Sequence, residues 1–306
     1  MVDEINIDCC CESIEEKEEK KGVNCFCENI KEENESRDFC SETIEKEEEN
    51  GFNCCCGDYE VTDDSKLENP QNSKKDIDLK TLNKIKNMAE SLDMDIIGFG
   101  KISKEEMKKN EKLIYPNAIV LTMKIGEKII NEPPSEFAQD LNNLLYDKFG
   151  KSLYIISDYL RKNDFATQVA HPHQNLLDLS KLAENSGIGI VGRSHLLITP
   201  ESGPSQKIGA ILTSIENLTF SKENTHKWIN DYCKRCGKCI KACPEDALKK
   251  DYMDENRAEF IESKCLGCNQ GCTYCIEECP FYKDEYNYLK EKHNKLESKL
   301  KEKGKI

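Results

Sequence analysis

Residues 233–244 read CKRCGKCIKACP, and this stretch decides how the C-terminal part of the chain folds. Its four cysteines and the following Pro244 match the C-x2-C-x2-C-x3-C-P spacing that holds a [4Fe-4S] cluster. A second stretch, CLGCNQGCTYCIEECP at residues 265–280, ends in the same x3-C-P step. The pattern therefore predicts two [4Fe-4S] clusters and a protein that transfers electrons.

The two motifs are expected to interlock, because in two-cluster ferredoxins the cysteine before the proline ligates the other cluster. The ligands expected for the first cluster are Cys233, Cys236, Cys239 and Cys279. Those expected for the second cluster are Cys272, Cys275, Cys243 and either Cys265 or Cys268. Strict spacing would place that last ligand at Asn269, so both cysteines stay open. Structural zinc is the alternative, but zinc modules lack the third C-x2-C step and the proline.

The chain has 306 residues and 18 cysteines, which in a secreted protein would suggest disulfides. However, the start Met1-Val2-Asp3-Glu4 is acidic, and neither a signal peptide nor an apolar run of membrane-spanning length is present. We therefore expect a cytoplasmic protein without a membrane partner, in an oxygen-avoiding setting where thiols and clusters persist.

The formal net charge of -14 is placed unevenly along the chain. Residues 1–76 hold 24 Asp and Glu against 9 Lys and Arg, whereas the remainder is close to neutral. A nucleic-acid-binding surface normally shows a basic excess, so the balance argues against a nucleic acid partner.

Residues 1–76 alternate small cysteine groups with acidic runs and contain too few apolar residues to bury a core. We expect this Cys-rich tail to be disordered. The alternative is a metal-binding or cluster-donating tail, since clustered thiolates are soft ligands.

Residues 77–225 have the patterning of a folded α/β domain. Apolar periodicity predicts helices over 79–92, from Ser135 onward and over 178–185, and strands over 94–98, 118–123, 196–199 and 208–214. The long helix should be capped by Ser135, and its expected apolar face is Phe137, Leu141, Leu144, Leu145 and Phe149. Residues 226–285 would form the ferredoxin domain.

Residues 286–306 are expected to form a charged helix that lies across its own domain. Its narrow apolar stripe is Tyr282, Tyr286, Leu289, His293, Leu296 and Leu300.

The glycines of residues 187–192, GIGIVG, fit the dinucleotide-binding fingerprint, but their context opposes it. That fingerprint needs a strand before it and a helix after it, whereas a helix is expected before these glycines and a strand after them.

Residues 187–204, GIGIVGRSHLLITPESGP, together with IGAILT at 208–213 and the double cysteine motif, carry a family resemblance. They resemble the corrinoid-dependent iron-sulfur reductases, a superfamily that includes epoxyqueuosine reductases and reductive dehalogenases. Upstream, LDMDIIG at 92–98 and YPNAIV at 115–120 are similar to the opening of the epoxyqueuosine reductase domain. The resemblance implies an α+β fold, with a nitroreductase-like α/β domain followed by a two-cluster ferredoxin-like domain.

The resemblance also implies a bound cobalamin and an electron donor such as a reduced ferredoxin or flavoprotein. Residues carried over to the corrinoid cavity are Gly192, Arg193, Ser194, His195 and Gly203. Epoxyqueuosine reductases have a catalytic aspartate where this chain has His171-Pro172-His173, so His173 and His171 are candidate proton donors. The alternative is a pair of surface histidines in a proline-containing loop.

Two functions follow from these patterns. The first is a reductase that passes electrons through two [4Fe-4S] clusters to a bound corrinoid. The alternative is an electron-transfer protein of the ferredoxin type, which has no substrate of its own and docks on a partner enzyme.

Overall fold

The computed structural model describes residues 64–103, 106–107, 113–174 and 176–304. The cysteine groups of the predicted N-terminal tail, at residues 9–56, lie outside the described residues. The described residues belong to one compact unit.

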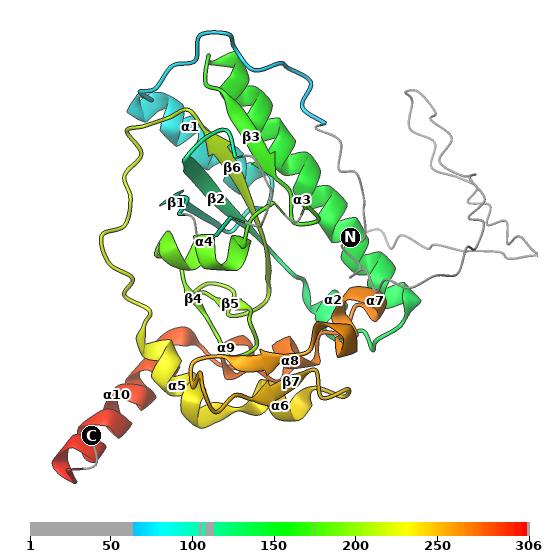
Figure 1. The fold of residues 1–306 in the computed structure, drawn as a ribbon, viewed down its shortest axis with the longest axis vertical. Helices are drawn as coiled ribbons and strands as arrows, with labels where there is room; N and C mark the ends of the chain where they lie inside the picture. The colour runs from blue at the N-terminus through cyan, green and yellow to red at the C-terminus, as the bar shows by residue number, and fades with distance from the viewer. Residues whose placement is uncertain (1–63, 104–105, 108–112, 175, 305–306) are drawn as a thin grey trace, which may run out of the picture. The chain divides into compact units, whose positions relative to one another are not determined.

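A four-stranded antiparallel sheet forms the centre of the α/β domain (Figure 1). Its strands, in spatial order, are β1 (Ile96–Lys101), β2 (Asn117–Lys124), β6 (Gln206–Thr213) and β3 (Thr167–Ala170). In the central pair, Val120 of β2 lies opposite Ala210 of β6. β2 is buried along nearly its whole length, as expected of a strand covered on both faces. The predicted strands at 94–98, 118–123 and 208–214 are therefore confirmed, with shifts of one to three residues at their ends.

Helices cover both faces of this sheet. α1 (Leu79–Ser91) and α3 (Glu136–Lys162) pack on one face, where Ile85 and Phe149 meet Ile119 and Leu121 in one core. α4 (Leu179–Asn185) covers the other face and buries Leu182 in a second core. Because alternate residues of β2 point into the two cores, the domain has a layered, mixed α/β architecture.

The N-terminus of α3 is capped as predicted, since the Ser135 hydroxyl accepts a hydrogen bond from the Ala138 amide at 3.1 Å. The predicted apolar face is confirmed in part: Phe149 is buried and Leu145 packs against the core, whereas Phe137 and Leu144 are 54% and 65% exposed. The buried positions before Phe149 are Ala138 and Asn142, because the neighbouring elements determine which side of the helix is covered.

The glycine-rich turn after α4 leads into two short strands, β4 (Ile190–Val191) and β5 (Leu197–Ile198). No helix begins at the third glycine, Gly192, which agrees with the argument against a dinucleotide site. A Cβ at Gly189 would collide with the Ile198 carbonyl group, so glycine allows the two strands to approach each other.

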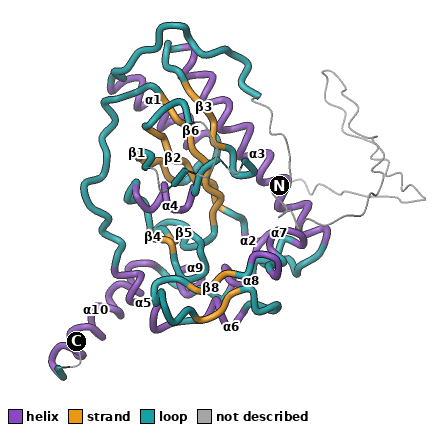
Figure 2. Tube along the Cα trace, viewed as in Figure 1, coloured by secondary structure: helices purple, strands orange, loops and turns teal. Residues whose placement is uncertain are grey.

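The remaining elements belong to the cysteine-rich module. In chain order they are α5 (Trp228–Cys236), α6 (Lys238–Ala242), β7 (Leu248–Lys250), β8 (Ala258–Phe260), η1 (Glu262–Lys264), α7 (Gly267–Gln270), α8 (Tyr274–Glu277) and α9 (Pro280–Lys283). Figure 2 shows that this module is built mainly from short helices and loops, in contrast to the sheet domain.

The module docks on the loops that surround α3. The Ser135 amide donates to the Gln270 carbonyl at 2.9 Å, and the Thr273 hydroxyl donates to the carbonyl of Ile130, in α2 (Glu127–Ile130), at 2.7 Å. Gly203 lies so close to the Phe281 backbone that no side chain would fit there.

The predicted C-terminal helix is present as α10 (Tyr286–Glu302), which buries Leu289 and His293 against the module. Its stripe is only partly covered, since Leu296 is 42% exposed, and Tyr282 belongs to α9 instead. Among the described helices, none combines the length and the apolar character that a membrane span requires.

Candidate functional site

Four of the motif cysteines surround one small cavity in the module. Cys233, Cys236, Cys239 and Cys279, here called the first cysteine group, line it together with residues that include Arg193 and Tyr232. Gly237 adopts a left-handed conformation, with φ of 63°, and lets the chain turn between α5 and α6. This turn brings Cys233 and Cys236 to the same cavity as Cys239.

A second set of cysteines gathers at the wall of a larger cavity. Cys243, Cys265, Cys272 and Cys275, here called the second cysteine group, all line it. Burial raises the pKa of Cys275 most, and charge on Cys239 and on the other three members of the group raises it further. The groups draw on both motifs, since Cys279 joins the first motif and Cys243 joins the second. The side chain of Cys268 lies outside the described part of the chain.

Burial disfavours the ionised form of these thiols. Burial raises the pKa of Cys233 and Cys275 to about 12, so without a metal both would stay protonated at neutral pH. Backbone N–H groups point at the sulfurs: the Ala247 amide donates to Cys243 Sγ at 3.2 Å, and the Arg193 amide donates to Cys233. Such hydrogen bonds are typical of thiolates that ligate an iron-sulfur cluster.

Two further observations fit a cluster in the first cysteine group. The Arg193 side chain is 5% exposed, and its Nε finds no hydrogen-bond partner among the described residues. A cluster offers sulfur acceptors beside such a donor. Nowhere in the described part of the chain do three or more His, Cys, Asp or Glu side chains form a site for a single metal ion.

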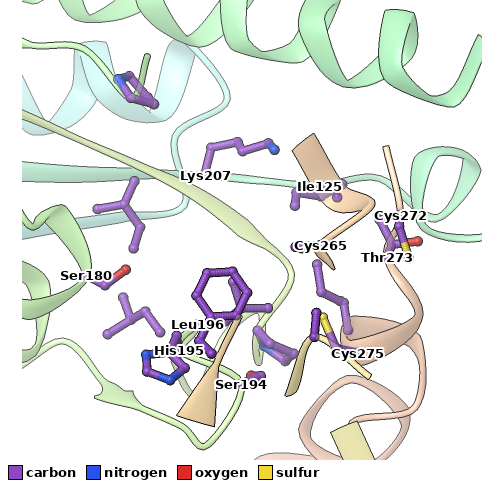
Figure 3. A pocket seen from close by; sticks show the side chains of 18 of the residues that line it. Ile125, Ser180, Ser194, His195, Leu196, Lys207, Cys265, Cys272, Thr273 and Cys275 are labelled. Atoms are coloured by element: carbon purple, nitrogen blue, oxygen red, sulfur yellow. The ribbon is translucent and has the colours of Figure 1, made fainter. Parts of the chain in front are cut away.

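The larger cavity has a volume of about 720 Å³ and lies between the sheet domain and the module. Figure 3 shows Lys207 and His195 on the sheet-domain side, with Cys265, Cys272 and Cys275 across from them. Its volume falls within the range of small-molecule and cofactor sites. A ligand in this cavity would contact both the second cysteine group and the polar end of the sheet domain.

The polar end of the cavity centres on Lys207, which β6 carries. Its ammonium donates to the Asn142 side chain and lies 3.8 Å from the centroid of the Tyr146 ring. Burial lowers the pKa of Lys207 to about 7, so the group can hold or release a proton at neutral pH. Lys207 is half-buried and lines the cavity.

The predicted histidines lie at the same end. The His173 ring lies 4.2 Å from Tyr146 and stacks on His171 at 5.5 Å, measured between ring centroids. Burial lowers the pKa of both, that of His171 to about 4, and the Lys207 charge lowers that of His173 further. His171 is 6% exposed and packs where a Cβ at Gly150 of α3 would stand. Both rings are therefore neutral at pH 7, and only His173 lines the cavity.

The residues expected around a corrinoid divide into two sets. Ser194 and His195 line the larger cavity, and the His195 Nε2 contacts the Ala258 carbonyl at 2.6 Å. Gly192, Arg193 and Gly203 instead face the module: Gly192 packs near Cys233, Arg193 lines the small cavity, and Gly203 meets Phe281.

Sequence reasoning did not single out Lys207, Tyr146 or Asn142. They lie on β6 and α3, far apart in the chain, and no short motif joins them. A charged residue within the buried strand QKIGAILT was the one available signal.

Comparisons with known proteins agree with this architecture. Residues 226–280 match a family model described as a 4Fe-4S dicluster domain. An epoxyqueuosine reductase of Listeria monocytogenes is 31% identical over 105 residues, covering 29% of this chain and 26% of its own length. A tetrachloroethene reductive dehalogenase of Dehalobacter restrictus is 28% identical over 137 residues, which cover 44% and 24% of the two chains.

A longer match is to an epoxyqueuosine reductase of Bacillus cereus, 25% identical over 193 residues, or 54% of this chain and 49% of the relative. The chain thus spans about a quarter to a half of the curated relatives it matches. Among solved structures, a catabolic reductive dehalogenase superposes with a TM-score of 0.56 at 16% identity, covering 66% of this chain and 32% of its own. A second reductive dehalogenase gives 0.58 at 16% identity, covering 73% and 35%. These superpositions show a shared fold.

Proposed function

Since the chain is a relative of the epoxyqueuosine reductases and the reductive dehalogenases and has a C-terminal ferredoxin-type module, we propose that it is an iron-sulfur reductase that acts through a bound corrinoid. One observation carries the proposal: the second cysteine group and the polar end around Lys207 line the same cavity of about 720 Å³. A cofactor in this cavity would be reached by electrons from one side and by protons from the other.

Under this proposal the first cysteine group holds one [4Fe-4S] cluster and the second group holds another, with Cys265 as the fourth ligand. The shared cavities of the two groups and the backbone donors that point at Cys233 and Cys243 support both assignments. Electrons would enter at the cluster farther from the cavity and leave from the nearer one. The four antiparallel strands with helices on both faces support a nitroreductase-like domain for residues 77–225.

The corrinoid would supply a metal centre that can be reduced to a strongly nucleophilic state. Ser194 and His195 would line its binding site, and the side chains around Lys207 would face the substrate. Lys207 is suited to hold a proton there because burial brings its pKa to about 7. The Tyr146 ring, which lies directly beside the ammonium, would help to position it. The neutral His173 ring would help to orient Tyr146.

The test is a titration of the anaerobically reconstituted full chain with cobalamin, followed by visible absorption. We expect a saturable change to a base-off spectrum, and about eight iron atoms per chain if two [4Fe-4S] clusters are present. Lys207→Glu should weaken cobalamin binding or change its spectrum without changing the iron content. A chain with full iron content and no spectral change at excess cobalamin would favour the electron-transfer protein that docks on a partner enzyme.

A further inference from the structure

The cysteine-rich module carries its charge unevenly. Residues 227–250, which hold most of the first cysteine group, contain seven Lys or Arg against three acidic residues. Residues 251–285, which hold most of the second group, contain three basic residues against nine acidic ones. The module is therefore basic around the first group and acidic around the second.

The basic part presents lysines on its surface. Lys238 and Lys241 are exposed on α6, and Lys249 and Lys250 are exposed on β7, which packs against α6. In the view of Figure 1, α6 lies on the side of the module away from the four-stranded sheet. These four lysines are called the lysine face here. None of them, and no cysteine of the first group, lines the larger cavity.

An apolar tip adjoins the lysine face. In the turn between β7 and β8, Tyr252 is 82% exposed and Met253 is 95% exposed. The Lys250 ammonium lies 5.0 Å from the centroid of the Tyr252 ring, which ties the tip to the lysines. The Asp251 carboxylate accepts the Met253 amide at 2.7 Å and so shapes the turn that presents both side chains. Exposed aromatic and methionine side chains beside charged groups are typical of protein interfaces.

We propose that the lysine face and its Tyr252–Met253 tip form the docking surface for a small acidic electron-carrier protein. Charge complementarity sets the occupant, because opposite charges steer transient redox partners together while a few apolar contacts fix their orientation. The lysines are mixed with acidic residues, which are Asp231, Glu245 and Asp246 and, beside the tip, Asp251, Asp254 and Glu255. Such a mixture suits a protein surface better than a uniformly charged nucleic acid backbone.

The position fits an entry point for electrons. Lys238 lies between Gly237 and Cys239, which line the small cavity of the first cysteine group, and none of the four lysines lines the larger cavity. At each encounter the carrier would lose one electron and the protein would gain it, with no proton transferred. This inference rests on the redox role proposed above, but it does not depend on whether a corrinoid binds.

The test measures binding of an acidic plant-type [2Fe-2S] ferredoxin to the cluster-loaded full chain by isothermal titration calorimetry. We expect Lys238→Glu/Lys241→Glu and Lys249→Glu/Lys250→Glu each to weaken the dissociation constant at least tenfold. Met253→Asp should weaken it several-fold. Wild-type affinity should fall as salt rises from 50 to 200 mM, because screening shortens the reach of surface charges.

The matched control is Lys84→Glu/Lys86→Glu, which makes the same charge change on exposed residues of α1, outside the module. It should change the affinity less than twofold. Visible absorption of the clusters checks that each variant contains them. The Lys249→Glu/Lys250→Glu variant also changes no residue inside either cysteine motif.

Three results would overturn the docking surface. These are absence of ferredoxin binding by the wild type, equal weakening by the control pair, and wild-type affinity in both lysine-face variants. An RNA hairpin that displaces the ferredoxin from the wild type would instead assign the lysine face to nucleic acid. A failed cobalamin titration beside intact ferredoxin binding would remove the corrinoid and keep the docking surface.

Discussion

Replacing Arg193 with Gln should lower the reduction potential of the cluster in the first cysteine group. Arg193 is 5% exposed, its amide donates to Cys233, and its Nε lacks a hydrogen-bond partner among the described residues. A buried positive charge beside a cluster favours the reduced form, which carries one more negative charge. Gln keeps a polar side chain of moderate length but removes the charge.

The size of the effect follows from Coulomb's law. A unit charge about 4 Å away, at an effective dielectric constant of about 20, contributes about 4 kcal/mol, and about half of that at roughly 8 Å. Since tenfold in a one-electron equilibrium is about 59 mV, the expected fall is roughly 80–170 mV. Water screens this charge little, because the side chain is buried.

The assay is an anaerobic redox titration of the full chain, followed by electron paramagnetic resonance of the reduced clusters. Arg193→Lys should keep most of the wild-type potential, because it keeps the charge. The control is Arg257→Gln, which removes an arginine that pairs with Glu184 at 3.1 Å beside the larger cavity. Shifts below about 20 mV in Arg193→Gln, or an equal shift in Arg257→Gln, would refute the reasoning.

Three further changes test other parts of the structure. Lys207→Met should stabilise the fold near pH 7. Between pH 7 and pH 9 the folded wild type loses the lysine proton while its unfolded chain keeps it, so the wild type becomes more stable as the pH rises. The advantage of Lys207→Met should therefore shrink by about 2 kcal/mol over that range in urea unfolding. Gly150→Ala should destabilise the protein by about 1–3 kcal/mol in the same assay, because the added methyl group occupies the place of the His171 ring. Cys265→Ser should lower the iron content by about half under anaerobic purification, whereas Cys268→Ser should leave it unchanged, because Cys265 lies among the second cysteine group.

Each of these has an outcome that would count against it. A gain for Lys207→Met that is constant with pH would mean that the folded-state pKa of Lys207 is not lowered. For Gly150, the matched control is Gly126→Ala, whose Cβ meets nothing within 4 Å, and an equal loss there would remove the packing argument. If Cys268→Ser loses iron and Cys265→Ser keeps it, the fourth ligand of the second cluster is Cys268 and not Cys265.

The sequence by itself determined the parts whose chemistry is local. Cysteines separated by two or three intervening residues, with Pro244 or Pro280 after the last of them, specify cluster ligands because a short loop can present them together. The cap at Ser135 and the strand around Val120 were likewise readable, since capping and apolar runs depend on near neighbours.

Only the tertiary structure decided which residues share the cavity. It brought Lys207 of β6 beside Tyr146 of α3, and it turned Arg193 toward the small cavity and His195 toward the large one. It also left Phe137 exposed, against the apolar pattern. The physical reason is that burial and pKa depend on which elements pack together, and that packing is set by contacts between segments far apart in the chain.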